Sequence, residues 1–337
     1  MANAHSFEVS IAGETLSQAE PQGLASLVVE DHVDKIAVAT LTIETGGIPW
    51  SKFVIGDEVT VKIGAGERPF TGLITELRHS ARKGHQSLIV TALDPLVLLA
   101  SSRHTRVFEE LTDSDIASSV MGDCSKLTVD NVESTSETRA YIFQRNESDL
   151  VFLKRLASRN GFVLRAEDGK ALFETPSVGG SPVEISFDGI QLLDYTMCNQ
   201  KIPTSLTVYG WDYVAKESVE GSAASSDIST IGSGKNAVDE SGTIWTEEAY
   251  ISDVLVQSQS AAKDMAVGEL SRLARSFLRG RTVMASRGDI FAGSTVKFSG
   301  FATGFNPEAF VVSVRHSLNT SGGNTTEVRF VSNTVPE

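Results

Sequence analysis

A chain of 337 residues is long enough for two or three domains, each with its own hydrophobic core. Hydrophobic residues make up 41% of the chain and charged residues 21%, which is typical of a globular protein and excludes a disordered or membrane-embedded one. The net charge of −14 argues against nucleic-acid recognition, because neutralising phosphates requires clustered Lys and Arg.

The sequence also carries no export signal that we recognise. Cys124 and Cys198 are too few for a disulfide framework. The first residues lack the basic and apolar regions of a signal peptide, and no stretch approaches the roughly 20 apolar residues of a membrane helix. We therefore expect that the protein is made in the cytoplasm and has no membrane segment. We also expect that it leaves the cell only by lysis or as part of a larger molecular machine.

Residues 7–100 are predicted to form β-strands throughout. The runs 24–29 and 36–43 are rich in β-prone residues and are divided by charged residues that suit a turn. Thr40 and Thr42 alternate with Leu41 and Ile43, as expected when one face of a sheet meets a core. Several short strands in about a hundred residues indicate a small barrel or sandwich, so we assign residues 1–100 to a first β-barrel.

The middle of the chain, residues 101–189, is predicted to be an α+β domain. Thr112 is the expected N-cap of a helix that ends at Gly122. A strand over 141–143 leads into a second helix, whose apolar face includes Phe152 and Leu156 and which Asn160–Gly161 terminates. A hairpin turning at Asp168–Gly169 follows.

Strand patterns resume at 190–195 and 205–211. Residues 215–243 are rich in Ser, Gly and Ala, which predicts a mobile loop, and apolar spacing predicts a helix over 258–278. We therefore expect a second, discontinuous β-barrel built from 190–214 and 281–332, with a variable loop and helix at 215–280.

Two stretches of the chain repeat each other. Both begin with glycine and end in Arg-His-Ser, and the steps from Gly56 to Arg78 and from Gly293 to Arg315 are both 22 positions. Each copy continues into another β-rich run. We interpret these stretches as two related β units. The alternative is two ordinary hairpins with similar turns.

Residues that would indicate catalysis or ligand binding are largely missing. The run 232–236 resembles a phosphate loop, but Ser229 and Asn236 stand where the motif needs Gly and Ser or Thr. His79 and His316 occupy the same place in the two copies, yet Glu76 is matched by Ser313, so a duplicated metal or catalytic site is disfavoured relative to structural histidines. We expect no catalytic residue, no cofactor and no metal.

The stretch 141–162 introduces a family resemblance. The order of Gln144, Asn146-Glu147-Ser148-Asp149, Phe152, Arg155 and Gly161 strongly resembles the motif of the phage late control gene D and VgrG-like baseplate hub family. The helix over 261–278 and the second repeat copy resemble that family's closing barrel. The positions that carry the motif are Gln144, Asn146, Glu147, Ser148, Asp149, Phe152, Arg155, Gly161, Gly293, Arg315 and His316.

The resemblance implies a β-rich α+β chain with two related tube-like β-barrels flanking a middle α/β domain. It implies a structural baseplate hub of a contractile tail, tailocin or injection system: a homotrimeric, pseudo-hexameric ring that adapts a hexameric inner tube above to a trimeric spike below. Other baseplate proteins would be further partners. Because the chain stops at Glu337, where fused members continue into a spike, we expect a separate spike polypeptide. Assembly is expected in the bacterial cytoplasm, before incorporation into a virion baseplate or an extracellular particle.

Two functions of other classes remain open. A tail-tip peptidoglycan hydrolase would need a convergent carboxylate pair or metal set, which the sequence does not reveal, and a zymogram would detect it. A carbohydrate-binding tail module would bind glycans as a monomer.

Overall fold

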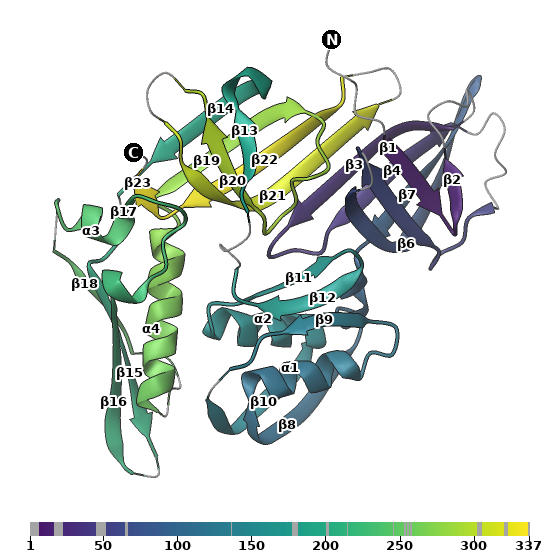
Figure 1. Ribbon diagram of the computed structural model, residues 1–337. Helices are drawn as coiled ribbons and strands as arrows, with labels where there is room; N and C mark the ends of the chain where they lie inside the picture. Colours follow the sequence, from purple (N-terminus) through teal and green to yellow (C-terminus); the bar gives the residue numbers. More distant parts are fainter. Residues whose placement is uncertain are drawn as a thin grey trace.

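The structure is a computed structural model that describes residues 7–16, 23–44, 52–64, 67–135, 137–176, 181–199, 202–213, 215–244, 246–252, 254, 256, 258–301, 305–319 and 323–335. Four regions are visible in Figure 1: two β units side by side, a middle domain beneath them, and an insert containing a long helix at one end. We call the β units unit one and unit two.

Unit one contains β1 (Phe7–Ile11), β2 (Glu14–Leu16), β3 (Leu24–His32), β4 (Val38–Glu44), β5 (Glu58–Ile63), β6 (Glu67–Arg82) and β7 (His85–Leu93). Unit two contains β13 (Val183–Ser186), β14 (Ile190–Met197), β19 (Leu278–Ala285), β20 (Thr295–Ser299), β21 (Glu308–Asn319) and β22 (Thr325–Ser332). These strands form because apolar side chains alternate with polar ones: in β4, Leu41 and Ile43 are fully buried while Thr40 and Thr42 are half-buried.

The two units share one strand order. In unit one the strands pair in the order β3-β4-β7-β6-β5-β1, and in unit two in the order β14-β19-β22-β21-β20-β13. The one difference is orientation, because β1 runs antiparallel to β5 whereas β13 runs parallel to β20. The hypothesis of two related β units is thereby confirmed at the level of strand pairing.

The register of the pairing is duplicated too. In unit one the β6–β7 ladder shifts between Ile74 and Glu76, and in unit two the β21–β22 ladder shifts at the matching place, between Val311 and Ser313. A β-bulge of this kind bends the strand and strengthens its twist. A second irregularity is also shared, in the ladders β3–β4 and β14–β19. Ordinary hairpins with similar turns would not reproduce both.

The expectation of two separate tube-like barrels needs correction. Among the described residues the strands pair as one continuous sheet, because β21 of unit two pairs antiparallel with β3 of unit one, and no pairing closes either unit into a barrel. Each unit instead curls around its own core. The core of unit one includes Val9, Leu27, Leu41, Val61 and Val90.

The middle domain packs below this sheet. It contains β8 (Arg103–Thr112), α1 (Asp113–Gly122), β9 (Thr128–Val132), β10 (Thr138–Ser148), α2 (Asp149–Arg159), β11 (Val163–Glu167) and β12 (Lys170–Glu174). A 3₁₀ helix, η2 (Pro95–Leu99), joins it to unit one and contributes Leu96 and Leu99 to the middle domain's core. Both helices and the hairpin lie where the sequence predicts them.

The insert interrupts unit two between β14 and β19. It contains β15 (Ser205–Asp212), β16 (Glu217–Ala224), β17 (Lys235–Asn236), α3 (Ala237–Ser241), β18 (Glu248–Ile251) and α4 (Gln259–Ala274), together with the 3₁₀ helix η4 (Ser225–Asp227). The short helix η3 (Phe187–Gly189) and strand β23 (Thr334–Val335) complete the described elements.

Two details of the expected domain plan differ from this arrangement. Strand β15 pairs with β16 and β18, so it belongs to the insert and not to the sheet of unit two, whereas β13 pairs with β20 of that sheet. The expected mobile loop at 215–243 contains two strands, β16 and β17, and two short helices, η4 and α3.

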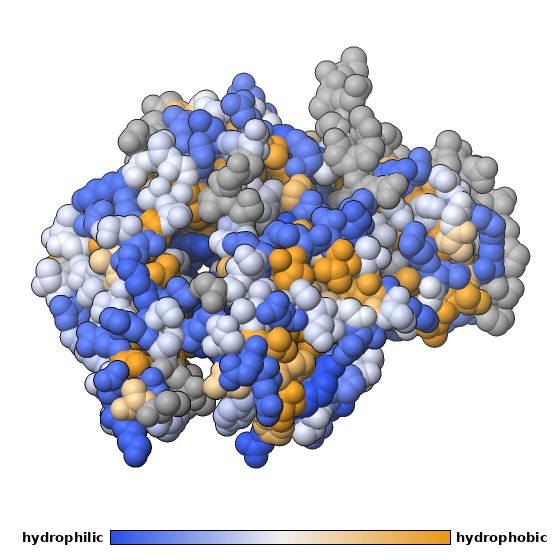
Figure 2. All heavy atoms as spheres, turned by 60° about the horizontal axis from the view of Figure 1, so that its bottom comes forward, coloured by the Kyte–Doolittle hydropathy of each residue, from blue (hydrophilic) through white to orange (hydrophobic). Residues whose placement is uncertain are grey.

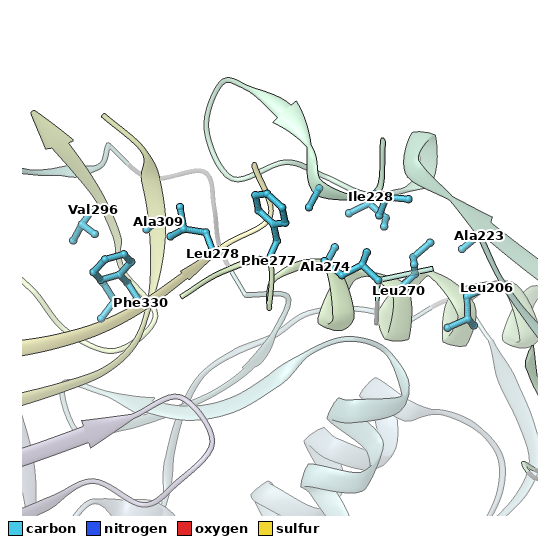
Figure 3. Close-up of a cluster of buried hydrophobic side chains, with 14 of the residues drawn as sticks. Leu206, Ala223, Ile228, Leu270, Ala274, Phe277, Leu278, Val296, Ala309 and Phe330 are labelled. Carbon is cyan, nitrogen blue, oxygen red and sulfur yellow. The ribbon is translucent and has the colours of Figure 1, made fainter. Parts of the chain in front are cut away.

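A continuous apolar core holds the insert to unit two. Figure 3 shows it passing from Phe330 of the sheet through Phe277 to Leu270 of α4, and on to Leu206 of β15. All four side chains are at most 5% exposed. The insert is therefore packed firmly against the unit that it interrupts.

Candidate functional site

The motif residues of the middle domain meet at the corner between β10 and α2. Gln144 is fully buried there, and its Nε2 donates hydrogen bonds to Asp149 Oδ1 (2.7 Å) and to the carbonyl of Glu147 (3.1 Å). Arg106 Nε of β8 donates to Gln144 Oε1 at 2.9 Å, and Arg106 also forms an ion pair with Asp149. His104 Nδ1 lies 3.0 Å from the same carboxylate. The buried polar groups of this corner thus satisfy one another.

Three further motif residues fix the geometry of the corner. Asn146 has a positive φ of 47° and is the extra residue of a bulge between β10 and β8. Ser148 caps α2, because its Oγ accepts from the backbone N–H of Val151 at 3.3 Å. Glu147 Oε1 accepts from Arg155 Nη2 at 2.6 Å, which ties the bulge to the helix.

Phe152 and Gly161 connect the corner to its surroundings. Phe152 is fully buried and stacks on Phe108 with ring centroids 5.6 Å apart. Gly161, with a φ of 69°, lies so close to α4 that an added Cβ would stand 3.2 Å from the Cα of Gly268. Their positions indicate packing and turn formation.

Two of the remaining motif residues, Arg315 and His316, lie at the joint between the units, which we define as the β21–β3 pairing, and the third, Gly293, lies in the turn before β20. Gly293 turns the chain with a φ of 95°, and its N–H donates to the carbonyl of Val311 at 2.8 Å. Arg315 lies opposite Glu30 with a 3.5 Å ion-pair distance. His316 is 1% exposed and lies opposite Val29. The two motif clusters are thus separate: the structure does not bring them together.

Two acids, the partly buried Asp31 and the buried Asp94, lie at contacts between regions. Asp31 Oδ2 of β3 accepts from the backbone N–H of Ala292 in unit two, and burial raises the pKa of Asp31 to about 6 although Arg165 opposes that shift. Asp94 accepts backbone hydrogen bonds from Ala37 and Leu96, and burial raises its pKa to about 7. Burial acts in the opposite direction on a base, and lowers the pKa of His316 to about 4.

A cleft separates the middle domain from the insert. It has a volume of about 730 Å³ and is lined by Asn160 and Gly161 on one side and by Lys263 and Gly268 on the other. Figure 2 shows the hollow between these two regions. Within the described ranges, His, Cys, Asp and Glu side chains do not gather in threes in a way that could hold a metal ion. Nor is any helix in that part of the chain long and apolar enough to cross a membrane.

Sequence reasoning missed the partners of the motif. Arg106 and His104 of β8 and Asp123 after α1 complete the network around Gln144, and Asp31 links the units. His104 and Arg106 are two residues apart in one β-prone run, and this spacing places both side chains on the same face of a strand. The spacing therefore indicates that this face contacts polar groups. Nothing local in the sequence places Asp31 opposite Ala292, which is far away in the chain.

Comparison with known proteins gives a family and a fold. A family model described as the Alg8 N-terminal domain matches residues 1–320. No curated protein matches significantly. The structure resembles the 43 kDa tail protein of prophage MuSo2 from Shewanella oneidensis (TM-score 0.72, 16% identity, covering 97% of this chain and 98% of the other). It also resembles the tail protein from Neisseria meningitidis MC58 (TM-score 0.72, 14% identity, 97% and 96% covered).

A third similar structure comes from a secretion system. The Escherichia coli c3393 protein is described as a component of the type VI secretion system with structural similarity to the T4 bacteriophage tail proteins gp27 and gp5 (TM-score 0.62, 12% identity, 96% of this chain and 76% of the other covered). At such low identities the likeness establishes a shared fold.

Proposed function

Because this chain belongs to the family of the Alg8 N-terminal domain and has the fold of phage tail proteins, we propose that it is a structural component of a contractile tail or injection apparatus. Its specific role would be that of the baseplate hub. Three copies would form a ring that presents six similar β units to a hexameric inner tube, and that seats a trimeric spike on its other face.

One observation carries this proposal: unit one and unit two share their strand order and both ladder irregularities, and they are already joined by a strand pairing within one chain. A chain built of two equivalent units is what lets a threefold assembly approximate sixfold symmetry. The role needs no catalytic group, and we place the protein among non-enzymatic tail components. Its site of action would be the baseplate of a virion tail or of an extracellular injection particle assembled in the bacterial cytoplasm.

The test is the oligomeric state of the purified full chain. We expect mass photometry to give the mass of a trimer, and negative-stain images to show a ring with six lobes around a channel. A species that remains monomeric at micromolar concentration, or a ring of another order, would contradict the hub role. A ring that binds the hexameric tube protein on one face would support it further.

A further inference from the structure

One face of the insert's sheet exposes large aromatic side chains. Strand β15 lies between β16 and β18, and α4 packs against one face of this sheet. Figure 1 shows α4 between the sheet and the middle domain. The opposite face carries Tyr209 and Trp211 of β15 and Tyr250 of β18, which are between 37% and 58% exposed. We call this opposite face the aromatic face.

The geometry of the strands places these rings together. Side chains at alternate positions of a strand point to the same side, so Tyr209 and Trp211 follow each other about 7 Å apart along β15. Val208, between them and the core, points to α4 and is fully buried. The ring of Tyr250 lies nearly parallel to that of Tyr209, with an angle of 24° and centroids 6.1 Å apart. The alternation continues to the exposed Tyr213, one residue beyond the strand.

The less buried faces of other strands in this molecule have a different composition. In β4 they carry Thr40 and Thr42, and in β5 they carry Thr60 and Lys62. Threonine and charged residues are sufficient for the solvent side of an antiparallel sheet. Neighbouring large side chains that remain in water and are rimmed by polar groups are instead typical of a binding surface.

Polar groups lie beside the aromatic rings. Glu220 of β16 lies directly opposite Tyr209. The hydroxyl group of Tyr250 donates a hydrogen bond to Glu248 of the same strand. In the part of the chain that the structure describes, neither the Glu220 carboxylate nor the indole N–H of Trp211 takes part in a hydrogen bond or an ion pair. The aromatic face therefore offers a free acceptor and a free donor next to its rings.

Charge and side-chain type narrow the class of ligand. Strands β15, β16 and β18 contain no Lys or Arg, so their carboxylates repel an anionic polymer. A protein partner is a poorer match, because Glu and Ser are depleted from protein interfaces and the aromatic face has no Leu, Ile, Val or Met. Flat rings flanked by hydrogen-bonding groups suit a ligand that is uncharged, rich in hydroxyl groups and apolar on one side.

We propose that the aromatic face binds an uncharged oligosaccharide. One side of a sugar ring presents C–H groups, whose slight positive charge suits the negative face of an aromatic ring. The sugar hydroxyl groups would donate to Glu220 and Glu248 and accept from the indole N–H of Trp211. Because the rings follow one strand, a chain of several sugar units fits better than a single sugar. This activity is additional to the structural role proposed above and does not depend on how the copies assemble.

Titration of the full chain with uncharged hexasaccharides tests the proposal. The probes are maltohexaose, cellohexaose and N-acetylchitohexaose, which differ in linkage or substituents and carry no charge. We expect isothermal titration calorimetry to detect binding of at least one of them. Hexagalacturonate, which has a carboxylate on every unit, is expected not to bind, because the acids of the aromatic face repel it. No binding of any uncharged probe at millimolar concentration, or equal binding of hexagalacturonate, would overturn the proposal.

Substitutions of Trp211 provide a second readout. We expect Trp211→Ala to lower the affinity for the bound hexasaccharide at least about tenfold, and Trp211→Leu to lower it nearly as much, because leucine is apolar but has no aromatic face. Trp211→Phe should retain most of the affinity. Tyr141→Ala removes an aromatic side chain of the middle domain that is 59% exposed, and this matched control should bind like the wild type. Wild-type affinity in Trp211→Ala, or an equal loss in the control, would overturn the proposal.

A basic peptide is the alternative occupant, because cations bind the faces of aromatic rings and are attracted by carboxylates. Octa-arginine, titrated under the same conditions, distinguishes the two. We expect the affinity for the hexasaccharide to be unchanged at about 0.5 M NaCl, since salt does not screen an uncharged ligand. Binding of octa-arginine that requires Trp211, without binding of any hexasaccharide, would assign the aromatic face to a protein partner and overturn the proposal.

Discussion

Gln144 and His316 are polar side chains that lie out of water, and each is stabilised there by specific partners. Gln144 is surrounded by Arg106, Asp149 and the Glu147 carbonyl. His316 Nδ1 lies 3.0 Å from Thr326 Oγ1. Both stand among the motif positions, and the structure indicates that their contribution is to the fold.

His316 makes the stability of the protein depend on pH. Burial holds its pKa at about 4, below the 6.5 of an unfolded histidine, so its contribution is fully present above pH 6.5 and is lost as the pH falls towards 4. In His316→Asn that dependence should disappear. We expect the free energy of unfolding of the wild type, relative to the variant, to be about 2 kcal/mol lower at pH 5 than at pH 7.

Denaturant unfolding at the two pH values measures the difference. His79→Asn, which replaces the exposed histidine at the matching position of unit one, is the control for the substitution itself. A relative stability of His316→Asn that is independent of pH would refute the assignment.

Replacing Gln144 tests the network at the corner. Gln144→Leu removes the acceptor of Arg106 Nε and one of the donors to Asp149, at a fully buried position. We expect a loss of about 2–4 kcal/mol, against about 1 kcal/mol for Ser148→Ala, which removes a helix cap alone. Amide hydrogen exchange along α2 reports both variants; equal protection in the two would show that the network adds nothing beyond capping.

At the scale of the elements, glycine and alanine allow helix α4 to lie directly against strand β16. An added Cβ at Gly221 would stand 2.1 Å from the backbone nitrogen of Lys263 in α4. Gly221 lies on the buried face of the strand, and the helix contributes Ala262 and Ala266, both fully buried. Contact this close leaves no room for an extra methyl group.

Gly221→Ala should therefore destabilise the insert. We expect a cost of about 2 kcal/mol or more, because the helix must move away from the strand and open the core behind it. Gly122→Ala is the matched control: its added methyl meets nothing within 4 Å, so it should be neutral or slightly stabilising. Thermal unfolding of the two variants beside the wild type checks this, and similar melting temperatures for both would contradict the packing argument.

The elements also show what the sequence could and could not reveal. Helices α1, α2 and α4 were predictable because their N-caps, Thr112, Ser148 and Ser258, and their apolar spacing are local signals. Strand β16 was missed since its Ser, Gly and Ala residues resemble a loop, whereas Gly221 is small because α4 packs against it. The partner of β15 and the merging of the two sheets depend on contacts between distant residues, which local patterns do not encode.

At the scale of the whole molecule, one β-ladder joins both units and Asp94 links unit one to the middle domain. Asp94 accepts from Ala37 in the turn after β3 and from Leu96 in η2, whose side chain is buried in the core of the middle domain. Because burial raises the pKa of Asp94 to about 7, above the unfolded value near 3.8, its carboxyl group binds a proton more readily in the folded chain.

The sign of the resulting pH dependence is opposite to that of His316. Stability from Asp94 is present at low pH and is lost as the pH rises through about 7. We expect the wild type to gain about 1 kcal/mol from Asp94 on going from pH 8 to pH 6, and Asp94→Asn to lack this gain. Thermal melts of both proteins at the two pH values provide the measurement, and parallel pH profiles would rule the effect out.

The position of the insert has a consequence for how the outside of an assembly looks. In unit one a short turn links β3 to β4, whereas the corresponding link in unit two, from β14 to β19, has grown into a domain with its own helix and sheet. Around a closed circle of three chains, every second hairpin would carry this outgrowth. The β units around the rim would share one backbone fold, but only every second one would carry the insert. A protein that binds the outside of the ring would therefore be able to distinguish unit two from unit one by the insert.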